Sequence, residues 1–245
     1  MNEVRAVILA AGKGTRMKSD LPKVLHHING KPIVQYVAEA CKKAGILDIY
    51  IIIGYCAELV KQALGPDYSY ILQQPQLGTG HALQMAAPCL KDYDGDLIVL
   101  VGDSPFITSE LLQQLIKKHQ KSDAVATFIT TVYEKTPPYA RIVRNVNGKV
   151  IKVIEEKNAP PEIRLIKEVL TSHYCFKSHI VLPLLVEIQK DPEKQEYYLT
   201  DIIDILINKN YLIETLQIED NRLVFGINDP RDFLKAADDY EKMRN

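Results

Sequence analysis

Short apolar runs alternate with helical patterns along the first half of this 245-residue chain, and this alternation constrains the fold more than any other feature. The run Ile49–Ile53 is unbroken and β-branched, which is typical of a strand covered on both faces of a parallel sheet. The alternation predicts right-handed crossovers and a mostly parallel, doubly wound, Rossmann-like α/β sheet. The strands expected in this half lie at residues 4–9, 49–53, 68–72, 96–101 and 124–132.

Proline, glycine and threonine mark the ends of the helices between these strands. Pro32 suits the first position of a helix that ends before Gly45. Thr108 suits the start of another helix, which we expect to reach about His119. Further helices are predicted to end at Leu64 and to cover residues 81–87.

The pattern changes from Tyr139 onward, because two strand-like segments now lie close together. Residues 140–145 and 149–155 flank Asn147-Gly148, a dipeptide that favours a hairpin turn. We interpret this hairpin, a strand at 166–176 and a helix at 178–189 as a substrate-facing extension of the same domain, so that residues 1–245 form one domain. The elements expected after this extension are a helix from Tyr197, a strand at 213–218 and a helix after Pro230.

The loop after the first strand has the character of an anion site. Small residues let backbone N–H groups approach a ligand closely, and Thr15 adds a hydroxyl. Three cations, Lys13, Arg16 and Lys23, favour a polyphosphate ligand over a merely structural turn. The loop matches neither the Walker pattern nor the dinucleotide fingerprint. Its small residues are Ala10, Ala11, Gly12 and Gly14.

Two further loops follow predicted strands and therefore belong at the same edge of the sheet. Gln73, Gly78 and Thr79 lie in the first, and we assign them to a nucleobase and its approach, since an amide reads a base edge well. The alternative is a surface turn. In the second loop, the carboxylate of Asp103 follows Gly102 and is well placed to bind a hard cation that faces phosphate oxygens. The alternative there is a turn-capping aspartate.

Composition limits the remaining classes of function. Lys plus Arg number 30 and Asp plus Glu 31, which argues against a nucleic-acid track or a membrane-surface protein. Four scattered cysteines argue against a zinc site, and the six histidines, which have no evident carboxylate partner, are expected to be structural. No apolar run reaches the ~18 residues of a membrane span and no secretion signal is present, so we expect a cytoplasmic protein.

Taken together, several motifs resemble those of the sugar-nucleotide pyrophosphorylases. The likeness is greatest to the uridylyltransferase domain of bacterial N-acetylglucosamine-1-phosphate uridylyltransferases, whose product is a cell-wall precursor. It spans the whole chain and implies a fold of the nucleotide-diphospho-sugar transferase type, with a nucleotide-binding half at about 1–132 and a sugar-binding half, which carries the hairpin, at about 133–245. The motifs that carry it are residues 9–17, 21–25, 76–82, 102–103, 196–203 and 226–228.

The resemblance implies a reaction between UTP and a sugar 1-phosphate with Mg²⁺ as cofactor. Arg16 and Lys23 would neutralise the triphosphate, and Asp103 and Asn228 would hold Mg²⁺. The nucleotide would be bound by Leu9, Ala11, Gly12, Gly14, Thr15, Gln73, Gly78 and Thr79. The sugar would be bound by Gly102, Ala140, Glu155, Leu170, Tyr198 and Thr200.

Departures from the family pattern fall at the sugar end. Ala140 and Ser172 each stand where glycine is usual, and Leu170 stands where asparagine is usual. Leu170 cannot hydrogen-bond a sugar hydroxyl or acetamido group, and a polar group left without a partner costs ~1–3 kcal/mol. The preferred acceptor is N-acetylglucosamine 1-phosphate, with another hexose or amino-sugar 1-phosphate, or another nucleoside triphosphate, as the alternative.

A second departure is that the chain ends at Asn245 without the acetyltransferase β-helix of bifunctional members, so we expect no acetyltransferase activity and regard a separate acetyltransferase as a candidate partner. The alternative hypothesis from a different functional class is a non-catalytic regulator that binds a sugar nucleotide. It leaves the presence of Arg16, Lys23, Asp103 and Asn228 unexplained.

Overall fold

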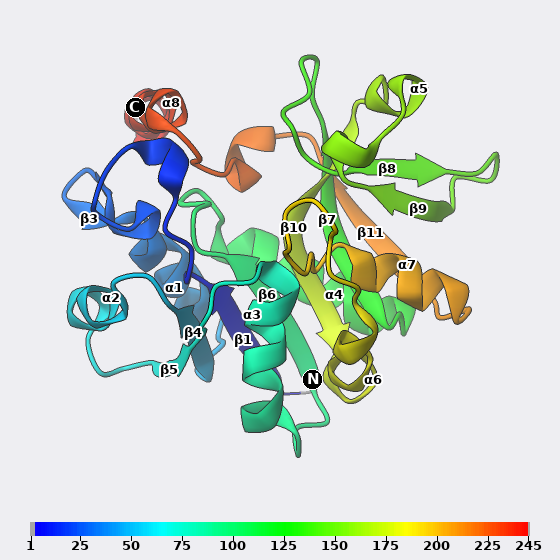
Figure 1. Ribbon diagram of the computed structural model, residues 1–245, viewed down its shortest axis with the longest axis horizontal. Helices are drawn as coiled ribbons and strands as arrows, with labels where there is room; N and C mark the ends of the chain where they lie inside the picture. The colour runs from blue at the N-terminus through cyan, green and yellow to red at the C-terminus, as the bar shows by residue number, and fades with distance from the viewer. Residues whose placement is uncertain (1–2, 245) are drawn as a thin grey trace.

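A nine-stranded sheet forms the centre of the protein in the computed structural model, which describes residues 3–244 (Figure 1). The strand order is β11-β7-β10-β6-β1-β4-β5, with β8 paired to β10 and β9 paired to β8. A separate short pair, β2 and β3, precedes the first long helix. The strands are β1 (Val4–Leu9), β2 (His27–Ile28), β3 (Lys31–Pro32), β4 (Ile49–Ile53), β5 (Ser69–Leu72), β6 (Asp96–Val101), β7 (Ala126–Val132), β8 (Arg141–Arg144), β9 (Val150–Ile154), β10 (Glu168–Lys177) and β11 (Ile213–Ile218).

Helices cover both faces of this sheet, because the strand residues alternate between two apolar clusters. Val7 of β1 belongs to the cluster that contains Leu83 and Ile202, whereas Ile8 belongs to the cluster that contains Val37 and Leu112 on the other face. This arrangement confirms the predicted α/β fold class with a doubly wound, mostly parallel sheet. The helices are α1 (Ile33–Lys43), α2 (Ala57–Leu64), α3 (Thr79–Ala86), α4 (Ser109–Ser122), α5 (Pro161–Arg164), α6 (Ser178–Leu184), α7 (Asp201–Asn208) and α8 (Pro230–Arg244).

Strand β10 lies in the middle of the sheet, where we did not expect it. It pairs antiparallel with both β6 and β7, whereas β1, β4, β5 and β6 are mutually parallel neighbours. The prediction that the strand at 166–176 belongs to a substrate-facing extension was therefore wrong, because β10 lies within the main sheet, between β6 and β7. Hydrophobic periodicity identifies a strand but not its neighbours, so the strand order lies beyond what the pattern specifies.

Several helix boundaries also differ from the expected ones. Lys31 and Pro32 pair with β2, so the first helix begins one residue later than predicted. The helix expected over 178–189 ends at Leu184, one residue after Pro183, and continues only as a short 3-10 turn. α7 begins at Asp201 instead of Tyr197, because Tyr197 donates its N–H to Leu77 and accepts one from Gly80. Likewise α3 begins at Thr79, two residues before the predicted start.

The carboxyl ends of β1, β4 and β6 meet at one edge of the sheet, as parallel strands require. The hairpin β8–β9 and α5 lie to one side of this edge, and α8 lies to the other (Figure 1). Gly148 takes a φ of +76° in the hairpin turn, which confirms the turn predicted at Asn147-Gly148. Among the described residues, none of the helices is both long enough and apolar enough to span a bilayer.

Candidate active site

Two adjoining hollows open at the carboxyl ends of β1 and β6. The nucleotide-side hollow, of about 430 Å³, is lined by the glycine loop and by residues 73–79. The sugar-side hollow, of about 210 Å³, is lined by residues of the 138–140 loop, β10 and the 224–228 segment. Arg16, Val101 and Asp103 line both hollows, so the two share a common boundary.

The glycine loop has its shape because only glycine fits at position 14. Gly14 has a φ of +68°, and a Cβ there would lie 2.5 Å from Cβ of Lys23. Tyr55 donates its backbone N–H to Ala11, which ties the loop to the end of β4. A Cβ on Gly12 would meet no atom within 4 Å, so its backbone stands open to a ligand. Leu9, Ala11, Gly12, Gly14, Thr15 and Arg16 all line the nucleotide-side hollow, where the sequence places a nucleotide.

The loop at residues 73–79 is held in shape by hydrogen bonds of its own side chains and by close contact with the segment before α7. Nε2 of Gln73, a residue only 3% exposed, donates to the Gly78 carbonyl at 2.9 Å and lies 3.1 Å from Nδ1 of His81. Gly78 has a φ of +95°, and a Cβ there would lie 2.5 Å from the Tyr197 carbonyl. Thr79 Oγ1 accepts the N–H of Leu199 at 3.0 Å. Gln73, Gly78 and Thr79 therefore line the hollow and also fix the loop that surrounds it.

Opposite charges converge where the two hollows meet. Lys23 Nζ contacts Asp103 Oδ2 and donates to Asn228 Oδ1 at 3.1 Å. Arg16 donates to the same Asn228 oxygen at 3.1 Å. One carboxylate and one amide oxygen, which lie 125 residues apart in the sequence (228 minus 103), thus face a single cationic atom.

This donor pair fits Mg²⁺ in its chemistry, since Mg²⁺ prefers oxygen ligands and usually completes its shell with water and phosphate. The two oxygens already converge on one positive charge. Within residues 3–244, no group of three or more His, Cys, Asp or Glu side chains is placed to hold a metal. Substrate phosphate oxygens would therefore have to supply further ligands.

The sequence did not predict a role for Tyr139, although this residue anchors the charged centre. Its hydroxyl accepts the N–H of Gly226 at 3.2 Å, and Asn228 Nδ2 donates to the Gly226 carbonyl at 3.0 Å. Burial raises the pKa of Tyr139. The buried guanidinium of Arg141 holds the same loop by donating to the carbonyls of Pro137 and Tyr139. No local signal marks Tyr139, because its partner lies 87 residues away.

The far end of the sugar-side hollow combines one carboxylate with an apolar wall. Glu155 Oε1 accepts a hydrogen bond from Thr200 Oγ1 at 2.6 Å, and burial raises the pKa of Glu155. Ala140 and Leu170 lie side by side, since the Leu170 N–H donates to the Ala140 carbonyl at 2.9 Å, and both line the hollow. Ser172, where the family usually has glycine, has a φ of +59°, a conformation that glycine adopts without strain.

Two residues assigned to the sugar do not line either hollow. Gly102 donates its N–H to the Leu9 carbonyl at 2.9 Å, and a Cβ there would lie 3.1 Å from that oxygen. It therefore allows close packing of two strand ends. The hydroxyl of Tyr198 lies 3.3 Å from Lys157 Nζ, which also forms an ion pair with Asp191. Both assignments stay predictions that rest on the resemblance.

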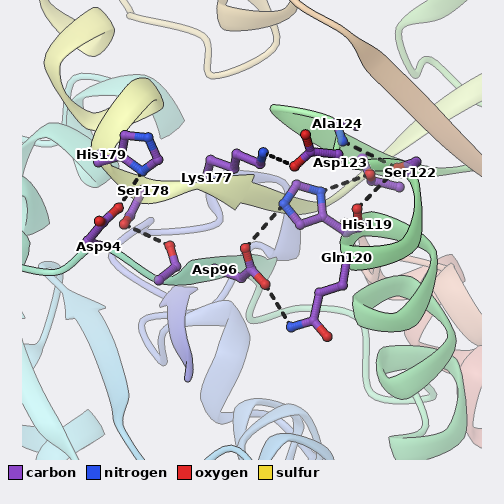
Figure 2. Close-up of polar contacts among 12 residues, drawn as sticks. Asp94, Asp96, His119, Gln120, Ser122, Asp123, Ala124, Lys177, Ser178 and His179 are labelled. Carbon is purple, nitrogen blue, oxygen red and sulfur yellow. Dashed lines mark hydrogen bonds and ion pairs between the residues drawn. The ribbon is translucent and has the colours of Figure 1, made fainter. Parts of the chain in front are cut away.

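The histidine prediction was incomplete, because two histidines do have carboxylate neighbours (Figure 2). His119 Nε2 lies 3.5 Å from Asp96, and His119 Nδ1 lies 2.9 Å from the Thr127 hydroxyl. His179 Nδ1 lies 2.6 Å from Asp94. The Asp96–His119–Thr127 arrangement is buried throughout and lies at the amino end of β6, opposite the hollows, so it cannot present a nucleophile to a substrate.

Comparison with known proteins agrees with this geometry. The family described as nucleotidyl transferase matches residues 5–240. The chain belongs to the nucleotidyl transferase family. It is 44% identical to the bifunctional protein GlmU of Acetivibrio thermocellus, over 97% of this chain and 51% of that protein. It is 41% identical to the bifunctional protein GlmU of Bacillus licheniformis, over 100% of this chain and 53% of that protein.

This nucleotidyltransferase thus spans about half the length of the curated relatives it matches. Solved structures resemble it in fold at lower identity. A structure described as a glucose-1-phosphate thymidylyltransferase from Bacillus anthracis gives a TM-score of 0.79 at 18% identity, over 96% of this chain and 94% of that one. A UDP-glucose pyrophosphorylase complexed with UDP-glucose gives 0.76 at 19% identity, over 99% and 100%. These two likenesses show the fold alone.

Proposed function

We propose that this nucleotidyltransferase joins UTP and a sugar 1-phosphate to give a UDP-sugar and pyrophosphate, with N-acetylglucosamine 1-phosphate as the first acceptor to test. The observation that carries the proposal is the cluster of Arg16, Lys23, Asp103 and Asn228 at the boundary of the two hollows. A reaction between two anions needs positive charge where they meet. The match of residues 5–240 to the nucleotidyl transferase family supports the transfer of a nucleotidyl group.

The chemistry requires alignment more than a protein nucleophile. An anionic oxygen of the sugar 1-phosphate forms a bond to the α-phosphorus of UTP, while the bond from that phosphorus to the bridging oxygen of pyrophosphate breaks. Because the attacking oxygen is already charged, no general base is needed. Lys23 and Arg16 reduce the repulsion between the two anions and stabilise the charge that spreads in the transition state.

Asp103 and Asn228 would hold Mg²⁺, which when bound supplies Lewis-acid charge stabilisation at the phosphate oxygens. The glycine loop surrounds the phosphates with N–H groups, and Gln73, Gly78 and Thr79 bind the base. Glu155 and Thr200 receive the sugar hydroxyls.

Another hexose or amino-sugar 1-phosphate is the second candidate acceptor. The adjoining side chains of Ala140 and Leu170 offer no hydrogen bond to an acetamido group or to a hydroxyl. This wall favours a sugar that presents an apolar edge or face at that point.

Pyrophosphate release tests the proposal directly. We would combine N-acetylglucosamine, glucosamine and glucose 1-phosphates with UTP, dTTP, CTP and ATP in the presence of Mg²⁺. Release that needs both substrates and is fastest with UTP supports the proposal. Release with none of these pairs, together with calorimetric binding of a UDP-sugar, would instead identify a sugar-nucleotide binding protein without catalysis.

A further inference from the structure

Both protons of the Gln73 side-chain amide are used within the protein. Nε2 of Gln73 donates to the Gly78 carbonyl at 2.9 Å and lies 3.1 Å from Nδ1 of His81. From these contacts we infer that His81 is a positioning residue, which holds the Gln73 amide with its oxygen toward the base of the bound nucleoside triphosphate and so selects a base that carries a ring N–H. The inference rests on the function proposed above and deepens it.

The Gly78 carbonyl determines the orientation of the Gln73 amide. A carbonyl oxygen only accepts hydrogen bonds, so the amide atom 2.9 Å from it has to be Nε2 and not Oε1. Nε2 of an amide only donates, so Nδ1 of His81 has to be the unprotonated ring nitrogen. Burial lowers the pKa of His81, which favours this neutral imidazole at pH 7.

The amide oxygen of Gln73 is left for a ligand. Among residues 3–244, no group donates a hydrogen bond to Oε1, and this oxygen is not one of the unpaired polar atoms that the protein encloses completely. Gln73 lines the nucleotide-side hollow, whereas His81 lines neither hollow. His81 can therefore act on a base only through Gln73, and Gln73 presents an acceptor where the base is proposed to bind.

Both partners of this contact are anchored by other groups. The Gln73 N–H donates to the Ile53 carbonyl at 2.8 Å, and the Gln73 carbonyl accepts a hydrogen bond from Nε2 of Gln76 at 2.9 Å. His81 lies in the first turn of α3, where its ring centroid is 6.3 Å from that of Tyr197. With both residues anchored, the contact between Nε2 and Nδ1 gives the amide one orientation before any nucleotide binds, which lowers the entropy cost of binding.

An acceptor at this point distinguishes the bases. Uracil and thymine carry a proton on N3, between two carbonyl groups, whereas N3 of cytosine is unprotonated and is itself an acceptor. A cytosine N3 opposite Oε1 of Gln73 would set two acceptors against each other and leave both without a hydrogen bond. The amide that His81 holds therefore favours UTP and dTTP over CTP.

His81→Phe tests the inference, because it keeps a ring beside Tyr197 and removes the acceptor at Nδ1. The Gln73 amide then has only the Gly78 carbonyl to hold it. We expect the dissociation constant for UTP to rise about three- to tenfold and that for CTP to stay within about twofold. The KM for the sugar 1-phosphate should also stay within about twofold. An unchanged ratio of the UTP and CTP dissociation constants would overturn the inference.

Two further substitutions at position 81 separate a positioning role from a packing role. His81→Asn loses the ring but keeps an acceptor close to the place of Nδ1, so it should restore the preference for UTP over CTP to within about twofold of wild type. His81→Ala removes the same acceptor without a bulky ring and serves where His81→Phe does not fold. A preference for UTP that is kept in His81→Phe and lost in His81→Asn would overturn the inference in favour of packing.

A double-mutant cycle tests whether His81 acts through Gln73. In a Gln73→Ala background, His81→Phe should change the dissociation constant for UTP by less than about twofold. Full additivity of the two substitutions would overturn the inference. The matched control is His179→Phe, since His179 lies beside Asp94 at the opposite end of the sheet and lines neither hollow. It should leave both nucleotide dissociation constants unchanged.

Calorimetric titration with UTP, dTTP and CTP, without a sugar 1-phosphate, keeps the inference distinct from the proposed function. A wild-type chain that binds UTP but releases no pyrophosphate overturns the proposed function, while the dissociation constants of wild type and His81→Phe still test the positioning role. Tighter binding of dTTP than of UTP overturns only the choice of UTP, since thymine carries the same N3–H. Tighter binding of CTP than of UTP, or binding of none of the three, overturns both.

Discussion

Single residues far apart in the sequence make the charged centre of this site. Lys23 follows the glycine loop, Asp103 follows β6 and Asn228 precedes α8, yet one ammonium group contacts both oxygens. Each of these side chains lies at the end of a regular element, so its position depends on the sheet and not on its neighbours in sequence. Lys23 and Asp103 are each about one-sixth exposed, at 16%. They are therefore open to a ligand and are not part of the core.

The first prediction concerns Lys23, which lines the nucleotide-side hollow and whose ammonium group contacts Asp103 at the boundary of the two hollows. Lys23→Met should lower kcat at least ~100-fold, as expected when a group that stabilises transition-state charge is removed. The matched control is Lys13→Met. Lys13 also lines the nucleotide-side hollow, but its ammonium lies over the Tyr55 ring at 5.0 Å and not beside Asp103. Steady-state kinetics should show less than about a tenfold effect for that variant.

Circular dichroism and thermal melting should show that both lysine variants remain folded. Full turnover by Lys23→Met, or its unfolding, would contradict the assigned role. An equal loss of kcat in both variants would mean that general positive charge matters and that the contact with Asp103 does not.

At the scale of elements, two loops form one junction over the nucleotide-side hollow. The loop before α3 and the segment before α7 exchange backbone hydrogen bonds, since Tyr197 donates to Leu77 and Gly80 donates to Tyr197. Glu196, from the same segment, lines the nucleotide-side hollow. The segment that we expected to start a helix instead forms an antiparallel bridge between Tyr197 and Lys190 and then a turn at residues 199–200, and it links the nucleotide loop to Thr200 at the sugar end.

Gly78→Ala should disrupt this junction. The new Cβ would lie 2.5 Å from the Tyr197 carbonyl and 3.0 Å from the Tyr197 nitrogen, in addition to the strain of a φ of +95°. The matched control is Gly65→Ala, because Gly65 has a φ of +78° but its Cβ would meet no atom within 4 Å. Gly65→Ala should cost about 1–3 kcal/mol in free energy of unfolding from backbone strain alone, because a φ of 78° with a ψ of -170° is a conformation that essentially only glycine adopts.

Urea unfolding should give a larger loss for Gly78→Ala, and kinetics should give a KM for UTP raised more than about tenfold. The KM for UTP should not change in Gly65→Ala. If the two variants lose equal stability and bind UTP alike, the contact between Gly78 and Tyr197 has no role in shaping the nucleotide-side hollow.

Elements whose signals are local could be predicted from the sequence. The glycine loop, the Gly102-Asp103 turn and the Asn147-Gly148 hairpin lie where expected, because small residues, strand ends and turn dipeptides act within a few residues. The start of α7 could not be predicted, because tertiary hydrogen bonds to Leu77 and Gly80 compete with helix formation at Tyr197. Tyr139 escaped notice for the same reason, as its partner Gly226 is distant in the sequence.

At the scale of the whole molecule, the sheet joins the two halves more closely than the sequence indicated. β10 comes late in the chain but lies between β6 and β7, so residues from both halves share one core. This insertion places residues 170–172, which lie in a β-bulge between Leu170 and Tyr174, in the lining of the sugar-side hollow, together with Asp103. Local patterns predicted that β10 was a strand. Its neighbours are determined by long-range packing, which no single segment encodes.

The pH dependence of global stability should reveal the repulsion between Asp201 and the neighbouring carboxylates of Glu155, Asp204 and Asp191. Burial, with the nearby charge of Glu155, raises the pKa of Asp201 to about 6. The folded chain therefore binds more protons at Asp201 than the unfolded chain between about pH 4 and 6, and the ionised group costs stability above pH 6. Asp201→Asn should raise the melting temperature above pH 6, and the difference from wild type should disappear as the pH falls toward 4.

The neighbouring Asp191 provides a control of opposite sign. The hydrogen bond from Lys157 lowers the pKa of Asp191 to about 2, so its ionised form stabilises the fold at all pH values above its unfolded pKa. Asp191→Asn should therefore lower the melting temperature at pH 7, whereas Asp201→Asn should raise it. Thermal melts of the three proteins at pH 4.5, 6 and 7.5 measure both signs. If both variants lower the melting temperature equally at pH 7.5, the ionised form of Asp201 stabilises the fold. Repulsion from the carboxylates of Glu155, Asp204 and Asp191 would then not destabilise it.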